Sequence, residues 1–321
     1  MKYQSIPHTD LHPSVLCFGT VSFGTAIDSS TAFRLLDTFF AQGGTFLDTA
    51  HVYGAWVPGG LGRSETIIGN WLHERHLRDE VVLGTKGGHP ALSAMHLPRL
   101  SRQDIVADLD ESLRCLRTEY IDLYWLHRDD PQRPVAELLD TLNDQVRQGK
   151  IRSFGCSNWR VKRVVEALQY ATTHRLAGFV CNQLMWSLAV PNREAIEDKM
   201  MVTMGTSAFT FHQEVGLPIV AYTSQAHGFF SKASNQAGAL PDALQKWYSN
   251  AENRERLRRL QTVSRELSLP IPVLLLAYLT SQSVLTFPVF SCRNAEQLRE
   301  NMQAGEVELA SDVVRYLEYG S

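Results

Sequence analysis

One stretch of the chain indicates its fold: residues 45–54, which read TFLDTAHVYG. Its first three residues favour a β-strand and two glycines precede them, so the pattern predicts a short buried strand entered from a helix end. The strand ends at Asp48, and Tyr53 follows five positions later. A carboxylate is costly to bury unless it is paired. The stretch therefore predicts a partner for Asp48 elsewhere in the chain.

Two later strands also end in polar side chains. Residues 81–86, VVLGTK, predict an apolar strand that ends at Lys86, and residues 121–127, IDLYWLH, predict one that ends at His127. Parallel strands that are joined by helices present their C-terminal ends at one face. We therefore expect Asp48, Tyr53, Lys86 and His127 to converge there.

The same alternation of strand and helix continues along the chain. The predicted strands are 15–18, 45–47, 81–86, 121–127, 151–156, 178–183, 218–222 and 284–290. The predicted helices are 29–40 with Ser29 and Ser30 as caps, 65–77, 101–116 with Ser101 as cap, 134–148, 161–173, 208–216, 250–267, 273–282, 294–304 and 311–319. Residues 191–206 and 223–242 are predicted to be loops, and residues 3–13 a short hairpin outside the main sheet.

This alternation is compatible with an open doubly wound sheet or with a closed (β/α)8 barrel. Eight units in 321 residues favour the barrel. The Gly-x-Gly-x-x-Gly turn of a dinucleotide-binding Rossmann domain does not follow the first strand. We therefore predict an α/β protein with one (β/α)8 TIM-barrel domain over residues 1–321 and a short N-terminal hairpin.

The composition of the chain argues against several classes of function. The formal net charge is -3, and basic residues do not gather in runs or alternate with aromatic ones, so a nucleic-acid partner is not expected. Apolar stretches stay well below the roughly 20 residues that span a bilayer, and the N-terminus lacks the apolar core of a signal peptide. The five cysteines are dispersed and odd in number. That pattern is typical of reduced thiols, so we expect a cytoplasmic protein that acts on small molecules.

The four strand-end residues suit proton transfer to a carbonyl oxygen. An ammonium about 4 Å from a phenol, at an effective dielectric constant of about 20, favours the phenolate by about 4 kcal/mol, or roughly 3 pKa units. Lys86 would thus make Tyr53 a usable acid and base, while desolvation would act in the opposite direction. Asp48 would hold the lysine, and a neutral His127 would orient a substrate oxygen. An external hydride donor is the natural complement.

These residues belong to a set of motifs that resembles the aldo-keto reductase family across essentially the whole chain. The motifs are Asp48-Thr49-Ala50-x-x-Tyr53-Gly54, Thr85-Lys86, Leu126-His127, Gly155-x-Ser157-Asn158, Asn182-Gln183 and residues 293–301, RNAEQLREN. Each motif alone is weak, but six in the right order are specific. The resemblance implies reduction of an aldehyde, ketone or sugar-like carbonyl by NADP(H), or the reverse reaction. It also implies a catalytic tetrad of Asp48, Tyr53, Lys86 and His127, with Tyr53 as general acid and base.

The resemblance further implies a binding site for NADP(H), with NAD(H) as the alternative. The implied cofactor-binding residues are Gly19, Thr20, Asp48, Ser157, Asn158, Gln183, Tyr222, Thr223, Ser224, Gln225, Ser291, Arg293, Gln297, Glu300 and Asn301. Ser157, Asn158 and Gln183 match the clamp on the nicotinamide carboxamide, and Tyr222 matches the aromatic residue on which the ring stacks.

At two places the chain departs from the family. Residues 223–225 are Thr-Ser-Gln where the family often has Ser-Pro-Leu, and Ser291 stands where many members have Gly or Lys. Recognition of the 2′-phosphate would then rest on Arg293, with Gln297 beside it. Glu300 and Asn301 match positions that face the adenine.

Two other functions compete with this interpretation. A metal-dependent hydrolase on the same barrel would use His51, His127, Asp48 and Asp129, but it lacks a His-x-His motif and Lys86 would repel the cation. The second alternative is a non-catalytic or regulatory NADP(H)-binding subunit with the same tetrad.

Several single residues have two interpretations. His51 is expected to line a pocket or bond within its loop, and Trp125 is expected in the core. Trp56 and Trp186 would either line the substrate mouth or pack. The Gly59-Gly60 and Gly87-Gly88 pairs fit tight turns better than phosphate nests, and Asp129-Asp130 fit loop charges better than metal ligands. The loops 55–63, 88–100 and 223–242 would choose the substrate, and the polar last one indicates a sugar-like carbonyl or hydroxyl compound.

Overall fold

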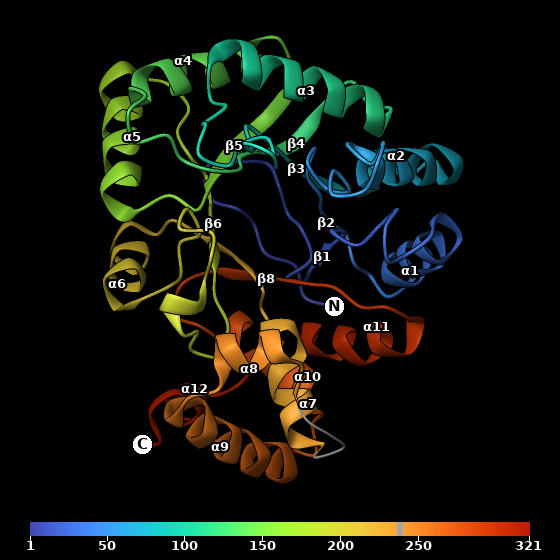
Figure 1. Cartoon of the computed structure of the whole chain (residues 1–321), viewed down its shortest axis with the longest axis vertical. Helices are drawn as coiled ribbons and strands as arrows, with labels where there is room; N and C mark the ends of the chain where they lie inside the picture. The colour runs from blue at the N-terminus through green and yellow to red at the C-terminus, as the bar shows by residue number, and fades with distance from the viewer. Residues whose placement is uncertain (236–239) are drawn as a thin grey trace.

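Eight parallel strands close into a barrel in their chain order, as the alternating pattern predicts (Figure 1). The computed structural model describes residues 1–235 and 240–321. The strands are β1 (Cys17–Gly19), β2 (Phe46–Asp48), β3 (Val82–Gly87), β4 (Ile121–Leu126), β5 (Ile151–Ser157), β6 (Asn182–Met185), β7 (Ile219–Tyr222) and β8 (Thr286–Phe290).

The helices form the outer layer around these strands (Figure 1). The α-helices of the described residues are α1 (Ser29–Ala41), α2 (Arg63–Arg75), α3 (Arg102–Leu116), α4 (Val135–Arg147), α5 (Val161–His174), α6 (Thr206–Val215), α7 (Phe229–Ser234), α8 (Asp242–Tyr248), α9 (Ala251–Leu267), α10 (Ile271–Thr280), α11 (Ala295–Met302) and α12 (Ser311–Tyr319). The 3-10 turns are η1 (Arg78–Glu80), η2 (Arg193–Ala195), η3 (Ala226–Gly228) and η4 (Gln303–Gly305).

The strand register brings the predicted site residues to one rim of the barrel. Gly19 of β1 pairs with Asp48 of β2, and Asp48 pairs with Gly84 of β3, two residues before Lys86. On the other side of the barrel, Ser157 at the end of β5 pairs with Gln183 of β6. Since parallel strands share their direction, the side chains that follow these positions open onto a single mouth.

The barrel interior is filled by large apolar side chains. One buried cluster contains residues from five of the strands, together with Cys181, which directly precedes β6: Cys17, Phe46, Leu123, Trp125, Cys181, Val220 and Phe287. Ile6 and Leu11 join the same cluster from the N-terminal segment, where Ile6 N–H donates to Leu11 O at 3.0 Å. The predicted hairpin is therefore present, and it closes the end of the barrel opposite the mouth.

Trp125 is fully buried, as expected, and it explains the glycine of the Gly155-x-Ser157-Asn158 motif. A Cβ at Gly155 would lie 2.5 Å from the Trp125 ring and 2.7 Å from the main-chain oxygen of Cys181. Only glycine lets β5 approach the indole this closely, because protein interiors are packed without spare volume.

Local capping signals account for the starts of α1 and α3. Ser101 caps α3 as predicted, and it forms a capping box in which its hydroxyl accepts from Asp104 N–H while Asp104 accepts from Ser101 N–H. The cap of α1 differs from the prediction of Ser29 and Ser30. Asp28 is the N-cap, and its carboxylate accepts from Thr31 N–H at 2.8 Å, because a carboxylate is among the strongest N-cap acceptors.

Several predicted boundaries shift by one or two residues, and two segments differ more clearly from the prediction. The sixth strand begins at Asn182, four residues later than predicted, and residues 178–181 lie outside it. Residues 223–242 are not a continuous polar loop: they contain η3 and α7, and α8 begins at Asp242. Phe229 and Phe230 of α7 are buried in a cluster with residues of α9 and α10, and that burial stabilises a helix within a polar sequence. Residues 236–239 of this segment lie outside the described residues.

The helices after β7 gather on one side of the barrel, where α9 packs against α7, α10 and α12 (Figure 1). Among the described residues no single helix has the length and apolar composition to cross a bilayer. Only α9 and α10 taken together meet those criteria, with a bend of 98° between them.

Candidate active site

The ammonium of Lys86 is the centre of the site, between Asp48 and Tyr53. Its Nζ donates to Asp48 Oδ2 at 2.5 Å, to the main-chain oxygen of Thr49 at 2.7 Å and to the Tyr53 hydroxyl at 3.2 Å. Lys86 and Asp48 are each 1% exposed. An ammonium carries three N–H donors, so these three contacts satisfy all of them and the carboxylate compensates the buried charge.

The turn after β2 carries Tyr53 to this position. His51 N–H donates to Lys86 O at 3.0 Å and continues the pairing with β3, and Tyr53 N–H then donates to Ala50 O at 3.0 Å. Gly54 has a φ of 100°, and a Cβ there would collide with the main-chain oxygen of Gly60. The Tyr53-Gly54 pair is thus a requirement of the turn, because only glycine adopts this conformation without strain.

The net pKa of Tyr53 differs from the expectation of a lowered value. Burial raises the pKa of Tyr53 above its ordinary 10.0, and the opposing effect of Lys86 is smaller. Burial also works to lower the pKa of Lys86, but Asp48 and Tyr53 together outweigh it, so that pKa is raised above 10.5. At neutral pH the cluster therefore holds a protonated phenol next to an ammonium, and the ammonium stabilises the phenolate that remains when the proton leaves.

His127 lies at the end of β4, and its ring is 6.1 Å from that of Tyr53 between centroids. Burial, aided by the Arg128 charge, holds the pKa of His127 well below its ordinary 6.5. The ring is therefore neutral at pH 7. Its Nδ1 is buried and has no hydrogen-bond partner among the described residues. An unpaired buried N–H is rarer than an unpaired acceptor, so we assign the proton to Nε2, which leaves that nitrogen a donor.

Two neighbours of His127 were not singled out in the sequence. The His89 ring packs edge-on against His127, with centroids 4.8 Å apart. The Arg128 guanidinium donates to the main-chain oxygen of His127 at 3.0 Å and to Asp198 Oδ2 at 2.9 Å. A signal was available for both, because His89 follows the Gly87-Gly88 pair at a strand end and Arg128 follows His127 directly.

The residues matched to a nicotinamide clamp form one network with the tetrad. Gln183 Nε2 donates to Asp48 Oδ1 at 3.1 Å. Asn158 Nδ2 donates to the Ser157 hydroxyl at 3.0 Å, and Asn158 Oδ1 accepts from the Tyr222 hydroxyl at 2.6 Å. Asn158 has a φ of 63°, a left-handed conformation that asparagine tolerates better than most residues. These side chains belong to β5, β6 and β7 or directly follow β5, and thus lie on the other half of the mouth from His89.

The remaining predicted cofactor residues extend from this network to α11. Gln225 Nε2 donates to Asn301 Oδ1 at 2.8 Å, and the Ser224 hydroxyl donates to the main-chain oxygen of Val289 at 2.7 Å. Arg293 N–H donates to Gln297 Oε1 at 2.9 Å. Arg293 is exposed beside Asn294, the N-cap of α11.

Five further predicted cofactor residues lie on β1 and after β1, β7 and β8. Thr223 has a φ of 57° and follows β7, Ser291 is exposed after β8, and Glu300 is partly exposed on α11. At β1 the Thr20 N–H and hydroxyl both donate to Asp48 O at 3.1 Å. A Cβ on the preceding Gly19 would lie 2.7 Å from the Val289 side chain.

The residues with two interpretations are placed as follows. His51 lines a cavity, and its Nδ1 lies 3.4 Å from Glu65 Oε2. Trp56 is 49% exposed, whereas Trp186 packs against Phe209 and Tyr278. Asp129 forms an ion pair with Arg163 at 3.3 Å.

The glycine pairs adopt turn conformations, with a φ of 62° at Gly59 and 72° at Gly88. Within residues 1–235 and 240–321, no group of three or more His, Cys, Asp or Glu side chains is arranged to hold a metal ion. The carboxylates proposed for the hydrolase, Asp48 and Asp129, are each paired with a basic side chain.

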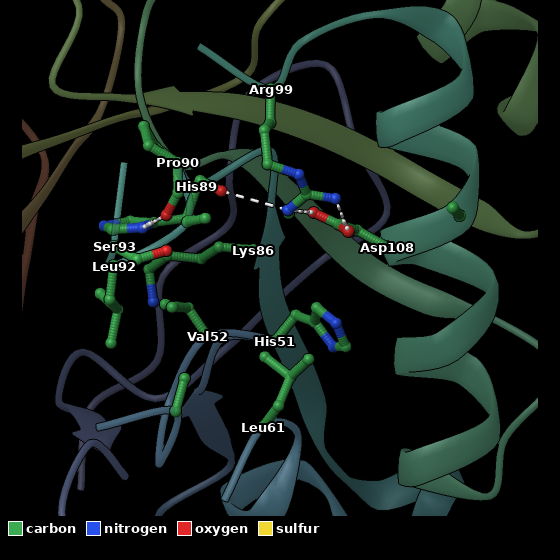
Figure 2. Close-up of a pocket in the computed structure, with 14 residues that line it drawn as sticks. His51, Val52, Leu61, Lys86, His89, Pro90, Leu92, Ser93, Arg99 and Asp108 are labelled. Atoms are coloured by element: carbon green, nitrogen blue, oxygen red, sulfur yellow. Dashed lines mark hydrogen bonds and ion pairs between the residues drawn. The ribbon is translucent and has the colours of Figure 1, made fainter. Parts of the chain in front are cut away.

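A cavity of about 670 Å³ opens beside Lys86, between the loop after β2, the loop after β3 and helix α3 (Figure 2). Its lining is mostly apolar, and it includes Val52, Ala55, Leu61, Pro90, Ala91 and Leu92. Figure 2 shows Arg99 at one end, bonded to Asp108 and to the main-chain oxygen of His89. The cavity thus lies on the β2–β3 side of the mouth, opposite the Asn158 network.

Comparison with known proteins agrees with this arrangement. The sequence profile described as "Aldo/keto reductase family" matches residues 15–319. The chain is 31% identical to "Uncharacterized oxidoreductase YrpG" of Bacillus subtilis (strain 168), over 99% of this chain and 95% of that protein. It is 27% identical to "Norsolorinic acid reductase B" of Dothistroma septosporum, over 99% and 81%, and 28% identical to an aryl-alcohol dehydrogenase of Pestalotiopsis microspora, over 98% and 80%.

Proposed function

Since the chain belongs to the aldo/keto reductase family, we propose that it is an NADP(H)-dependent oxidoreductase that converts a carbonyl group into an alcohol, or the reverse, with Tyr53 as general acid and base. The family uses nicotinamide cofactors, and its relatives include proteins named as oxidoreductases. The observation that carries the proposal is the 3.2 Å contact between Lys86 Nζ and the Tyr53 hydroxyl, with Asp48 on the other side of the ammonium.

In the reductive direction Tyr53 donates its proton to the substrate oxygen. The raised pKa of Tyr53 keeps this proton in place at neutral pH. As the proton leaves, the phenolate forms 3.2 Å from Lys86, and a positive charge at that distance stabilises it. Asp48 keeps the lysine oriented and charged. In the oxidative direction the same phenolate accepts the proton of the alcohol.

His127 orients the oxygen that receives this proton. Its pKa is held well below 6.5, so the neutral ring donates one hydrogen bond from Nε2 and keeps its proton. A donor aimed at the oxygen, where negative charge develops, lowers the barrier. Tyr53 and His127 would then hold one substrate oxygen between them.

The chemistry of the side chains around the mouth suits a nicotinamide dinucleotide. When bound, such a cofactor supplies or accepts the hydride. Ser157, Asn158 and Gln183 carry hydroxyl and amide groups that match a carboxamide, and the Tyr222 ring is held by its bond to Asn158. At the far end, the exposed Arg293 lies at the N-terminus of α11. A guanidinium and a helix N-terminus both favour a phosphate, which supports NADP(H) over NAD(H).

A cellular location and a class of substrate can be proposed in the same way. We propose that the protein is a cytoplasmic enzyme that acts on small molecules, because all five cysteines are free and buried. One relative is named as an aryl-alcohol dehydrogenase, and the apolar cavity beside Lys86 accommodates an aryl or alkyl body of similar kind.

The test is a panel of aldehydes, ketones and sugars, with NADPH oxidation followed by absorbance. Reduction of at least one class of compound is expected. EDTA should leave the rate unchanged, because Asp48 is already paired with Lys86 and is not needed as a metal ligand. Activity lost with EDTA and restored by zinc would favour the hydrolase instead. A protein that binds NADPH tightly but reduces nothing in the panel would favour the regulatory subunit.

A further inference from the structure

We propose that His89 is a substrate-binding residue that accepts a hydrogen bond from a hydroxyl group next to the reacting carbonyl. The preferred substrates are then neutral α-hydroxy ketones or α-hydroxy aldehydes with an apolar body. This inference rests on the proposed carbonyl chemistry and names its substrate class.

The position of His89 is the first argument. His89 follows β3, lines the 670 Å³ cavity together with Lys86, and is 9% exposed. Its ring packs edge-on against His127 at 4.8 Å between centroids. His89 therefore connects the cavity wall to His127, because it lines the one and contacts the other.

The second argument is the hydrogen-bonding state of the ring. His89 Nδ1 lies 2.7 Å from the main-chain oxygen of Pro90. A carbonyl oxygen only accepts, so Nδ1 carries the proton. Burial and the Arg128 charge lower the pKa of His89 below its ordinary 6.5, which keeps the ring neutral. Nε2 is consequently a lone-pair acceptor, and among the described residues no hydrogen bond occupies it.

The two histidines are complementary. His127 Nε2 is a donor and would bind the carbonyl oxygen of a substrate, whereas His89 Nε2 is an acceptor and requires an O–H or N–H. Their ring centroids are 4.8 Å apart, so a substrate that binds both nitrogens would carry its two polar groups on neighbouring atoms. A carbonyl with a hydroxyl on the neighbouring carbon has this pattern of acceptor and donor.

The charges of the cavity indicate a neutral substrate. Arg99 has both of its terminal nitrogens within 3.2 Å of Asp108 oxygens. Lys86 is paired with Asp48, and His51 with Glu65. Each basic group at the wall is thus compensated, so an anionic substrate would gain little there.

The apolar lining defines the rest of the molecule. Leu61 and Leu92 are 57% and 44% exposed at the cavity edge, and Val52, Ala55 and Pro90 lie with them in the lining. Apolar surface that a ligand covers is removed from water, at roughly 25 cal/mol per Å². A compact sugar would leave this surface uncovered, whereas an aryl or alkyl group would fill it.

The experiment compares 2-hydroxy-1-phenylethanone with 1-phenylethanone as substrates. His89→Phe keeps a ring against His127 but removes the acceptor, and His89→Gln restores an acceptor. His96→Phe is the matched control, because His96 is exposed on the same loop and does not line the cavity. The readout is the ratio of kcat/KM for the two ketones, in which the difference in their intrinsic reactivity cancels between variants.

A neutral hydrogen bond contributes about 0.5–1.5 kcal/mol, or about 2- to 12-fold at 1.4 kcal/mol per decade. His89→Phe should lower the ratio by that factor, His89→Gln should recover part of it, and His96→Phe should not change it. An unchanged ratio in His89→Phe, whether both rates are kept or both fall equally, overturns the inference while the carbonyl chemistry stands. A wild-type protein inactive on all carbonyl compounds overturns the proposed function and this inference with it.

Discussion

Replacing Lys86 by methionine tests the central contact of the site. The ammonium lies 3.2 Å from the Tyr53 hydroxyl. At an effective dielectric constant of about 20, a unit charge at this distance stabilises the phenolate by about 5 kcal/mol, or roughly 4 pKa units. General acid catalysis contributes about 100- to 10,000-fold. Lys86→Met should therefore lower kcat for carbonyl reduction by at least about 100-fold, measured from the absorbance of NADPH.

The same substitution leaves Asp48 buried without its cation. Breaking a buried ion pair costs about 3–5 kcal/mol in the free energy of unfolding, so urea titration should reveal a large loss of stability. The double variant Asp48→Asn/Lys86→Met removes both charges and should regain most of that stability without regaining activity. If the double variant recovers more than half of the wild-type rate, the lysine does not act through its charge on Tyr53 and the reasoning is refuted.

Four further outcomes are expected. Tyr53→Phe should reduce turnover at least about 100-fold and leave NADPH binding, followed by fluorescence, within twofold; more than half of the activity remaining would contradict the role of Tyr53. Arg293→Ala should weaken NADPH binding about 10- to 150-fold, because a charge-assisted contact contributes roughly 1.5–3 kcal/mol, and it should have little effect on NADH binding. Equal weakening for both cofactors would show that Arg293 does not bind the 2′-phosphate. The acid must be protonated and the pKa of Tyr53 is raised above 10.0, so the rate of reduction should stay constant from about pH 7 to about pH 9 and fall only as the pH rises further; a decline that begins below about pH 9 would contradict the raised pKa. Gly155→Ala places a Cβ 2.5 Å from Trp125 and should lower the free energy of unfolding by about 1–3 kcal/mol, measured by urea titration.

The barrel was predictable because its signals are local. Alternating strands and helices, together with Asp48, Lys86 and His127 at strand ends, are properties of short windows of sequence, and parallel connection then brings those ends together. Boundaries were less predictable where they depend on distant partners. The start of β6 at Asn182 depends on pairing with β5 and β7. Likewise Phe229 and Phe230 become helical because α9 and α10, more than 20 residues away, bury them.

The amino-acid sequence by itself determined the fold class, the family and the identity of the groups at the mouth. Only the tertiary structure decided the pKa values of these groups, their mutual contacts and the shape of the cavity beside them. Whether the pKa of Tyr53 rises or falls depends on burial against the Lys86 charge, and both are set by packing from several strands. The contact of His89 with His127 and the cavity between β3 and α3 likewise join segments that are separate in the chain. Desolvation and distance are properties of the folded arrangement, and no short window of sequence contains them.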